Sequence, residues 1–423
     1  MNTAIPLRTL RLGSLLAGLL ACGLAGAQTA PPPAAAASAP AGPTLRAELR
    51  TLLLEAQTLL TDKNPAAAKE KLQAANAIAD KTPYESYITA RIGMALAITQ
   101  DDAVNAARLL EQVLQLNASG AWISAAETLP MMQSVGIAHY RVKDYAQAAA
   151  WMERNIKAGG SESAVRDLRM QSYLLAGNLE RGSELLTEEI AAAEKANRLP
   201  AQAHLEMLVQ ARTALKDTAG STKVLEKLVQ LYPSKDHWRS LMNRLWSRSD
   251  LAIRLQLDVF RLVFFVTAPD EVTDFSEYVD FAQKAGFSSE ALRIYDQGAA
   301  LGLLGTSDAH KKLRAKLVQE TEQDRKTLAT DTAAALKKPD GFALFNIGLN
   351  LVGMQQFDKG LELMEKALAK GIAKRPEDAR LRLGVAYALA GQADKARQTL
   401  ASVSGPEGLD SLVLYWTWAI KKP

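Results

Sequence analysis

From Leu45 onward, apolar residues return every three or four positions along the chain, and helix-forming residues dominate. This period places the apolar side chains on one face of a helix, and no alternating segment is long enough to indicate a strand. Proline suits the first turn of a helix because its missing amide donor is not needed there. The pattern therefore predicts short helices joined by tight turns. The turns are expected at Asn64-Pro65, Thr82-Pro83, Gly159-Gly160, Leu199-Pro200, Tyr232-Pro233 and Ala268-Pro269.

Certain residue pairs recur at a spacing of twelve. They are Gly136 with Ala148, Met170 with Gly182, Gly348 with Gly360 and Gly384 with Ala396. The first two pairs lie 34 residues apart and the last two lie 36 apart. A period near 34 is typical of a helix–turn–helix repeat, which cannot bury its apolar face alone and stacks on its neighbours. We therefore expect an all-α solenoid.

The unit from Ser134 to Ala148 resembles the tetratricopeptide repeats, with Gly136 in its first helix (helix A) and Ala148 in its second (helix B). The units around Gly348 and Gly384 resemble the same family, and weaker copies centre on Ala106, Tyr173, Leu225 and Ala282. The resemblance implies a right-handed superhelix whose A helices line a concave groove. It also implies that the protein binds a protein or peptide partner there.

The pattern divides the chain into five segments. Residues 1–27 combine Arg8 and Arg11, a short apolar run and the site Ala25-Gly26-Ala27, which predicts a signal peptide cleaved after Ala27. Residues 28–43 are a Pro/Ala-rich linker. Residues 44–304 form an N-terminal solenoid and residues 339–423 a C-terminal repeat pair with a capping helix. Between them, the charged segment 305–338 is either a bridge of one or two helices beginning near Ser307 or a poorly matching repeat.

Cys22 is the only cysteine and lies inside the predicted signal peptide. Cleavage after Ala27 leaves no thiol, which excludes disulfides and Cys-based metal sites from the mature chain. The alternative is lipidation at Cys22, since Leu19 to Cys22 resembles a bacterial lipoprotein processing site. We expect a periplasmic protein, with an envelope lipoprotein as the alternative.

The charge balance does not favour nucleic acid as the main ligand. The formal net charge is +4, and loss of Arg8 and Arg11 lowers it to +2. Catalytic signatures are absent as well: there is no phosphate-binding loop or dinucleotide fingerprint, and the four histidines lack ligand spacing. Ser307 lies in a segment that resembles a nucleophile elbow, but helix capping explains it better. We therefore predict no enzyme activity, cofactor or metal.

Candidate binding residues follow from the repeat register. Taking Trp238 and Leu241 as the helix A signature places four side chains on the groove side: Asp236, Arg239, Asn243 and Trp246. Arg239 is suited to a bidentate pair with a carboxylate or phosphate, and Trp246 is a flat anchor of the kind enriched at binding hot spots. The alternative is that Arg239 is a solvated charge and Trp246 a core residue. The same register adds Gln133, Tyr140 and Gln171 as groove candidates.

Two further segments are expected to be core. The apolar run from Val259 to Val266 carries Asp258 and Arg261 at its start and is interpreted as packing between repeats. Tyr415 and Trp416 belong to an end helix that covers the last open apolar face.

The segments 232–238 and 374–379 resemble periplasmic repeat proteins of Gram-negative bacteria that are often encoded beside TonB-type components. That resemblance implies an accessory role in energy transduction or envelope assembly. Our leading hypothesis is an exported, non-catalytic scaffold that binds a peptide segment or an envelope protein. The alternatives are a lipid-anchored assembly factor and, less favoured, a cell-wall-acting enzyme with its site in the irregular segment from Ser307 to Lys338.

Overall fold

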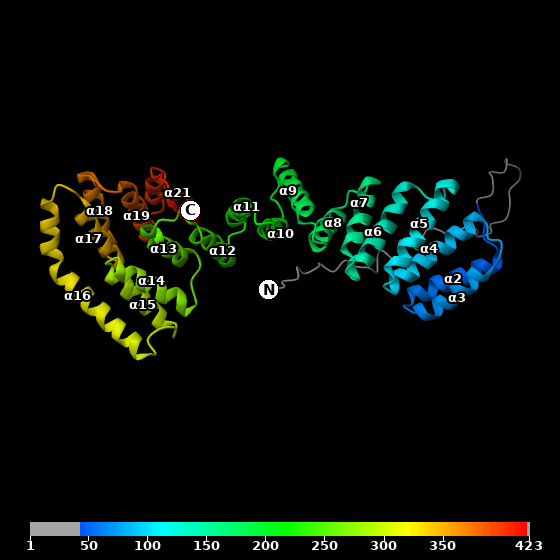
Figure 1. Cartoon of the computed structure of the whole chain (residues 1–423), viewed down its shortest axis with the longest axis horizontal. Helices are drawn as coiled ribbons and strands as arrows, with labels where there is room; N and C mark the ends of the chain where they lie inside the picture. Colours follow the sequence, from blue (N-terminus) through cyan, green and yellow to red (C-terminus); the bar gives the residue numbers. More distant parts are fainter. Residues whose placement is uncertain (1–42, 421–423) are drawn as a thin grey trace, which may run out of the picture. The chain divides into compact units, whose positions relative to one another are not determined.

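The computed structural model describes residues 43–420, so the predicted signal peptide, Cys22 and nearly all of the linker lie outside the described residues. Within this range the chain is all α-helical and contains no strand, which confirms the predicted helical-repeat solenoid (Figure 1). No helix in residues 43–420 combines the length and the apolar character needed to cross a bilayer.

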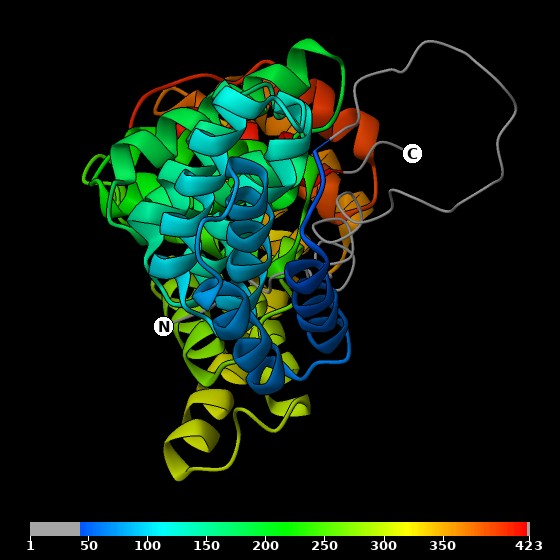
Figure 2. The same cartoon turned by 90° about the vertical axis from the view of Figure 1, so that its right-hand side faces the viewer.

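The described chain forms two compact units. The first comprises residues 43–200 and Gln210–Asp217, and its helices are coloured from blue to green in Figure 2. Its helices are α2 (Ala47–Thr61), α3 (Pro65–Ala77), α4 (Pro83–Thr99), α5 (Ala103–Gly120), α6 (Ala125–Arg141), α7 (Tyr145–Lys157), α8 (Ser163–Leu175) and α9 (Leu179–Lys195). Helix α10 (Gln202–Ala214) contributes residues to both units.

The second unit comprises Ala201–Val209 and the described residues from Thr218 onward. Its elements are α11 (Thr218–Leu231), α12 (Lys235–Trp246), the 3-10 turn η1 (Ile253–Leu255), α13 (Gln256–Val266), α14 (Val272–Lys284), α15 (Ser288–Ala300), α16 (Asp308–Lys337), α17 (Phe342–Gly353), α18 (Phe357–Lys370), α19 (Pro376–Leu389), α20 (Ala393–Leu400) and α21 (Leu409–Ala419).

Most of the predicted turns begin helices as expected. Asn64 caps α3 by accepting a hydrogen bond from the Ala67 amide, and Pro65 opens the helix. Ser234, after Pro233, caps α12 in the same way through the His237 amide. The charged segment 305–338 is one long helix, α16, whose N-cap Ser307 accepts from the His310 amide. Ser307 is therefore a capping residue.

The repeated small residues let the two helices of a hairpin approach closely. A Cβ built on Gly348 would lie 2.7 Å from the Gly360 carbonyl oxygen, and one on Gly360 would lie 2.7 Å from the Gly348 carbonyl oxygen. Helices α17 and α18 thus touch backbone to backbone. At Gly136 the nearest neighbour of an added Cβ is the terminal methyl of Met152, which can rotate away.

This difference predicts unequal costs for the same substitution. Gly348→Ala should destabilise the protein by about 1–3 kcal/mol, because rigid backbone must move apart. Gly136→Ala should cost less than about 1 kcal/mol, because Met152 can adjust and alanine is the better helix former. Urea denaturation followed by circular dichroism measures both. Equal costs would contradict the role assigned to the Gly348–Gly360 contact.

The start of the first unit is fixed by a buried carboxylate. Glu85 is 1% exposed and accepts from the backbone amide of Thr82 at 2.9 Å as half of a capping box on α4. The Arg46 guanidinium donates to both Glu85 carboxylate oxygens at 2.9 Å. The hydrogen bond from Arg46, against the opposing effect of burial, lowers the pKa of Glu85 from 4.5 to about 2. One ionised side chain thereby ties the residues before α2 to the start of α4.

Because its pKa is lowered on folding, ionised Glu85 stabilises the first unit above about pH 4.5, and this contribution disappears as the pH falls toward 2. We expect Glu85→Gln to cost about 2 kcal/mol at pH 7, and the difference from the natural chain to shrink below about pH 4. Urea denaturation at pH 7 and pH 3 tests this. Glu70→Gln, at an exposed position of α3, is the control and should change stability little at either pH.

Candidate partner-binding surfaces

The predicted groove residues of α12 lie on its surface beside α14. Arg239, with a side chain 34% exposed, forms ion pairs of 3.3–3.4 Å with Asp270, Glu271 and Asp274. Lys235 pairs with Asp270 at 2.7 Å. Burial raises the pKa of Asp274, and the charges of Glu271 and Asp270 add to that effect. Two cations thus face three carboxylates, so a partner's carboxylate would have to compete with the chain's own for Arg239.

Trp246, at the end of α12, is neither fully solvated nor fully buried. Its side chain is 36% exposed, and its ring packs edge-on against Phe260 and Phe281, with centroid distances of 5.0 and 5.9 Å. Asn243 and Asp236 are exposed on the same helix. The exposed part of the Trp246 ring remains available as an apolar anchor held by two phenylalanines.

In the first unit, two of the three predicted groove residues meet. The Tyr140 hydroxyl on α6 donates to the Gln171 side-chain oxygen on α8 at 3.4 Å, so these two A helices present a shared surface. Burial raises the pKa of the Tyr140 hydroxyl, which stays protonated near neutral pH. Gln133 lies two turns before Tyr140 and is only 6% exposed, so very little of its surface is accessible to a partner.

The same register applied to the C-terminal repeat pair gives a different result. Phe342, at the start of α17, is 53% exposed and Ala388 is 8% exposed, but the other six groove positions are at most 6% exposed: Phe345, Leu349, Val352, Asp378, Leu381 and Val385. Leu349, Val352 and Val385 line a gap of about 10 Å³ together with Arg261 of α13 and Glu290 of α15. A gap of that size holds at most one water molecule. The inner face of this pair is therefore filled by earlier helices of the same chain.

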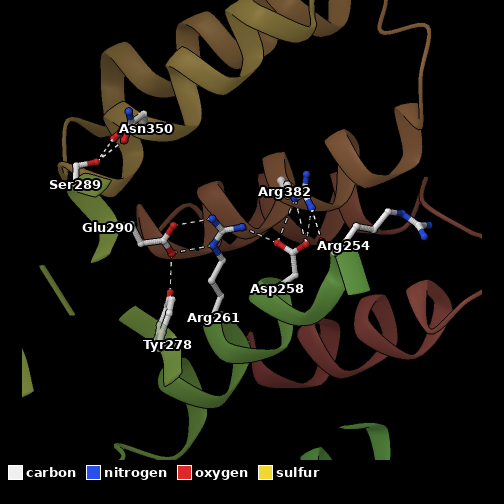
Figure 3. A network of polar contacts seen from close by, with 8 residues as sticks. All are labelled: Arg254, Asp258, Arg261, Tyr278, Ser289, Glu290, Asn350 and Arg382. Atoms are coloured by element: carbon white, nitrogen blue, oxygen red, sulfur yellow. Dashed lines mark hydrogen bonds and ion pairs between the residues drawn. The ribbon is translucent and has the colours of Figure 1, made fainter. Parts of the chain in front are cut away.

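A buried ionic network joins these helices (Figure 3). Arg261 donates to Asp258 at 2.6 Å and to both oxygens of Glu290 at 2.9 and 2.6 Å. Asp258 also accepts from Arg382 of α19 at 3.0 Å, and Glu290 accepts from the Tyr278 hydroxyl at 2.6 Å. Asp258, Arg261 and Glu290 are all at most 4% exposed. Helices α13, α14, α15 and α19 thus converge on one set of paired charges.

The charges in this network offset the effect of burial. Burial alone would raise the pKa of Glu290, but the charge of Arg261 and its hydrogen bonds hold that pKa below its usual value. Burial would lower the pKa of Arg261, but the charges of Glu290 and Asp258 raise it well above its ordinary value. Nearby, Arg254 before α13 donates to Asp378 of α19 at 2.6 Å and also pairs with Glu407. Ser289 donates to Asn350, which links α15 to α17.

The two segments expected to be core are buried in part: Phe265, within the run from Val259 to Val266, is 39% exposed, but other residues of both segments are buried. Val259 and Leu262 of α13 are at most 1% exposed, and Tyr415 and Trp416 of α21 are at most 3% exposed. The Trp416 ring lies 5.0 Å from that of Phe265, so the end helix covers α13.

Removing Arg261 leaves Glu290 buried and without its main partner, and loss of one member of a buried pair typically costs about 3–5 kcal/mol. We expect Arg261→Met to destabilise the second unit by about 3 kcal/mol, and Arg261→Met with Glu290→Gln to recover part of that loss. Arg314→Met is the matched control, because it breaks an exposed pair with Asp296 and should cost less than about 1 kcal/mol. Equal costs for the two arginines, measured by urea denaturation, would contradict this.

Within residues 43–420, no three His, Cys, Asp or Glu side chains are arranged so that they could hold a metal ion together. Three histidines have local partners there. His139 contacts Asp144 at 3.0 Å, and His237 contacts the Tyr232 carbonyl oxygen at 2.6 Å. His310 accepts from the Gly305 amide at 3.1 Å. These contacts hold turns and helix ends in place.

Sequence reasoning missed the filled groove of the C-terminal pair. One local signal was present: Asp258 and Arg261 lie three residues apart within an apolar helix, which is the spacing of an ion pair on one helix face. Their partners Glu290 and Arg382 follow 29 and 124 residues later, and no sequence pattern links them.

Residues 351–414 match a protein family described as Tetratricopeptide repeat. The match covers the end of α17 through most of α21 and supports the repeat interpretation of the C-terminal pair. No curated protein matches the chain significantly.

Several solved helical proteins are similar at low identity. The structure of Naa15/Naa10 bound to HypK-THB shows 17% identity over 86% of this chain and 58% of that chain, with a TM-score of 0.30. The TPR2AB domain of yeast Sti1 in complex with pHSP90 shows 12% identity over 69% and 99%, with a TM-score of 0.25. The apo form of RapI shows 11% identity over 65% and 99%, with a TM-score of 0.30. Scores of this size establish neither a shared function nor a shared site.

Proposed function

We propose that this chain is an exported, non-catalytic scaffold that holds a peptide segment or a protein of the cell envelope on exposed faces of its A helices. A helical-repeat fold presents rows of side chains from successive hairpins and is suited to binding other proteins. The proposal includes an accessory role in TonB-type energy transduction or envelope assembly, on the resemblance of segments 232–238 and 374–379 to periplasmic repeat proteins.

The observation that carries the proposal is the packing of the second unit. One face of its repeat pair meets α13 and α15 of the same chain: Arg382 of α19 donates to Asp258 of α13, and Leu349, Val352 and Val385 line a small gap together with Arg261 and Glu290. The inner face of this pair therefore already binds polypeptide, although the polypeptide is its own. A partner is left with A-helix surfaces that are not filled, such as Gln171 on α8 and Trp246 on α12.

Site-specific photo-crosslinking in intact cells tests the proposal. A photoreactive phenylalanine analogue would replace Gln171 or Trp246 in turn, with exposed Lys366 of helix α18 as the control position. We expect adducts with one or a few envelope proteins from the A-helix positions and none of these from the control. If all three positions give the same products, or none, the A-helix surface is not the binding face.

The proposed location is tested separately. We expect the chain in the periplasmic fraction, shortened by the segment ending at Ala27, which mass spectrometry of its N-terminus would reveal. Metabolic labelling with a palmitate analogue distinguishes the lipid-anchored alternative, because only a chain lipidated at Cys22 takes up the label. A cytoplasmic, full-length chain would contradict export. It would not affect the conclusion from crosslinking, which tests the binding face independently.

A further inference from the structure

A polar cleft lies in the first unit over helix α4. It has a volume of about 490 Å³ and runs between the B helices α3 and α5, both of which pack on α4. Residues from Ser86 of α4 to Gln100, which caps the end of that helix, line its floor over a length of about 21 Å at about 1.5 Å per residue. An extended peptide rises about 3.3 Å per residue, so roughly six residues would fill this length.

Small side chains keep the floor of the cleft open. Ala90, Gly93 and Ala97 recur on one face of α4 and line the cleft. A Cβ built on Gly93 would lie 3.3 Å from Leu109 of α5 and 3.5 Å from Leu72 of α3, so the two walls meet the floor at this residue. A larger side chain here would displace those walls. The small side chains on this face of α4 therefore determine the depth of the cleft.

The walls carry side chains that match a polypeptide backbone. Five amide side chains line the cleft: Gln73, Asn76, Gln100, Asn105 and Gln112. An amide offers both donors and an acceptor, which is what the N–H and C=O groups of an extended chain require. None of the lining residues is aromatic. The cleft therefore lacks the stacking platforms on which proteins hold bases.

The charge of the cleft is positive and is not neutralised within the protein. Lys69, Lys81 and Arg108 line it together with one carboxylate, Asp102. Asp102 is occupied as the N-cap of α5, where it accepts from the Asn105 amide at 3.1 Å. Arg108 donates to the neutral Asn105 side chain at 2.9 Å, and Lys81 donates to the Asn76 carbonyl oxygen at 2.8 Å.

This contrasts with neighbouring arginines of the same unit. Arg154 pairs with Glu111, and Arg141 pairs with Asp101 at 2.8 Å. No ion pair within residues 43–420 involves Lys69, Lys81 or Arg108. Cations left unpaired in a cleft attract anionic groups, and Lys69 and Arg108 are both exposed to solvent.

We propose that the cleft between α3 and α5 binds an extended acidic peptide segment, with its backbone on the amide side chains and its carboxylates on Lys69 and Arg108. This cleft, on α3, α4 and α5, is distinct from the A-helix faces of α6, α8 and α12 assigned above. The inference rests on the proposed function only in that the ligand is polypeptide. Charge complementarity and the length of the cleft select the occupant.

Binding of synthetic peptides to the whole mature chain tests this. The probe is a fluorescent, N-acetylated and C-amidated peptide of alternating Ser and Glu, with Ser-Lys and Ser-Gln peptides and oligothymidylate as comparisons. We expect fluorescence anisotropy at low salt to show that the Ser-Glu peptide binds at least about tenfold more tightly than each comparison, with affinity falling as salt rises. Equal binding of oligothymidylate or of the Ser-Lys peptide, or no binding of the Ser-Glu peptide, would overturn the inference.

Variants locate the binding. Lys69→Glu with Arg108→Glu should weaken Ser-Glu binding about tenfold or more. Arg50→Glu with Lys157→Glu changes the net charge equally at exposed positions outside the cleft, and should alter affinity less than about twofold. Gln73→Ala with Gln112→Ala, which changes no charge, should weaken binding about threefold or more. Equal loss in both charge-reversal variants would show attraction to net charge alone and would overturn the site.

Circular dichroism and urea denaturation confirm that each variant remains folded. Crosslinking at Gln171 and Trp246 is independent of this cleft, so either result can fail without the other.

Discussion

The second unit depends on a guanidinium that is withdrawn from water. Arg261 is 4% exposed, and an unpaired ion at such a position is not tolerated, since desolvation costs several kcal/mol. Four helices therefore supply its surroundings: Asp258 on its own helix, Glu290 and Tyr278 from α15 and α14, and Arg382 from α19, which balances Asp258. A well-packed apolar cluster of similar volume would hold these helices equally well. What the ionic network adds is a requirement for particular partners at particular positions.

That requirement bears directly on function. The charged residues select α13 and α15 as the segments that fill the inner face of the C-terminal repeat pair, and the gap left beside Arg261 is only about 10 Å³. A partner that used this face would have to expel α13 and expose Arg261 and Glu290 together. The desolvated charges make that exchange unfavourable unless the partner supplies equivalent pairs. The proposed partner binding is therefore assigned to surfaces whose polar groups are exposed or paired near solvent.

The sequence predicted what depends on neighbours along the chain. The spacing of Gly348 and Gly360 identified a close backbone contact between the two helices of a hairpin. Ser307 was recognised as a helix cap, an effect that arises within the first turn of the helix. The composition of α13 indicated core packing correctly. The sequence could not predict which helix packs against the inner face of the C-terminal repeat pair, because the contact of Asp258 with Arg382 joins residues 124 positions apart. The register that placed Arg239 on a surface also carried no information about Asp270, Glu271 and Asp274, which now surround it.

The basic residues of this protein differ in whether their charge is already paired with carboxylates of the chain itself. Arg239, Arg254 and Arg261 each face two or three carboxylates of the chain itself, so their charge is used within the fold. Lys69 and Arg108 differ because the one carboxylate that lines the α3–α5 cleft with them, Asp102, caps α5 and forms no ion pair with them. An anion that approaches them gains attraction without displacing an internal pair, whereas at Arg239 it would meet repulsion from three carboxylates first. The state of pairing, more than the presence of a cation, decides which basic residues of a helical repeat can recognise an acidic partner.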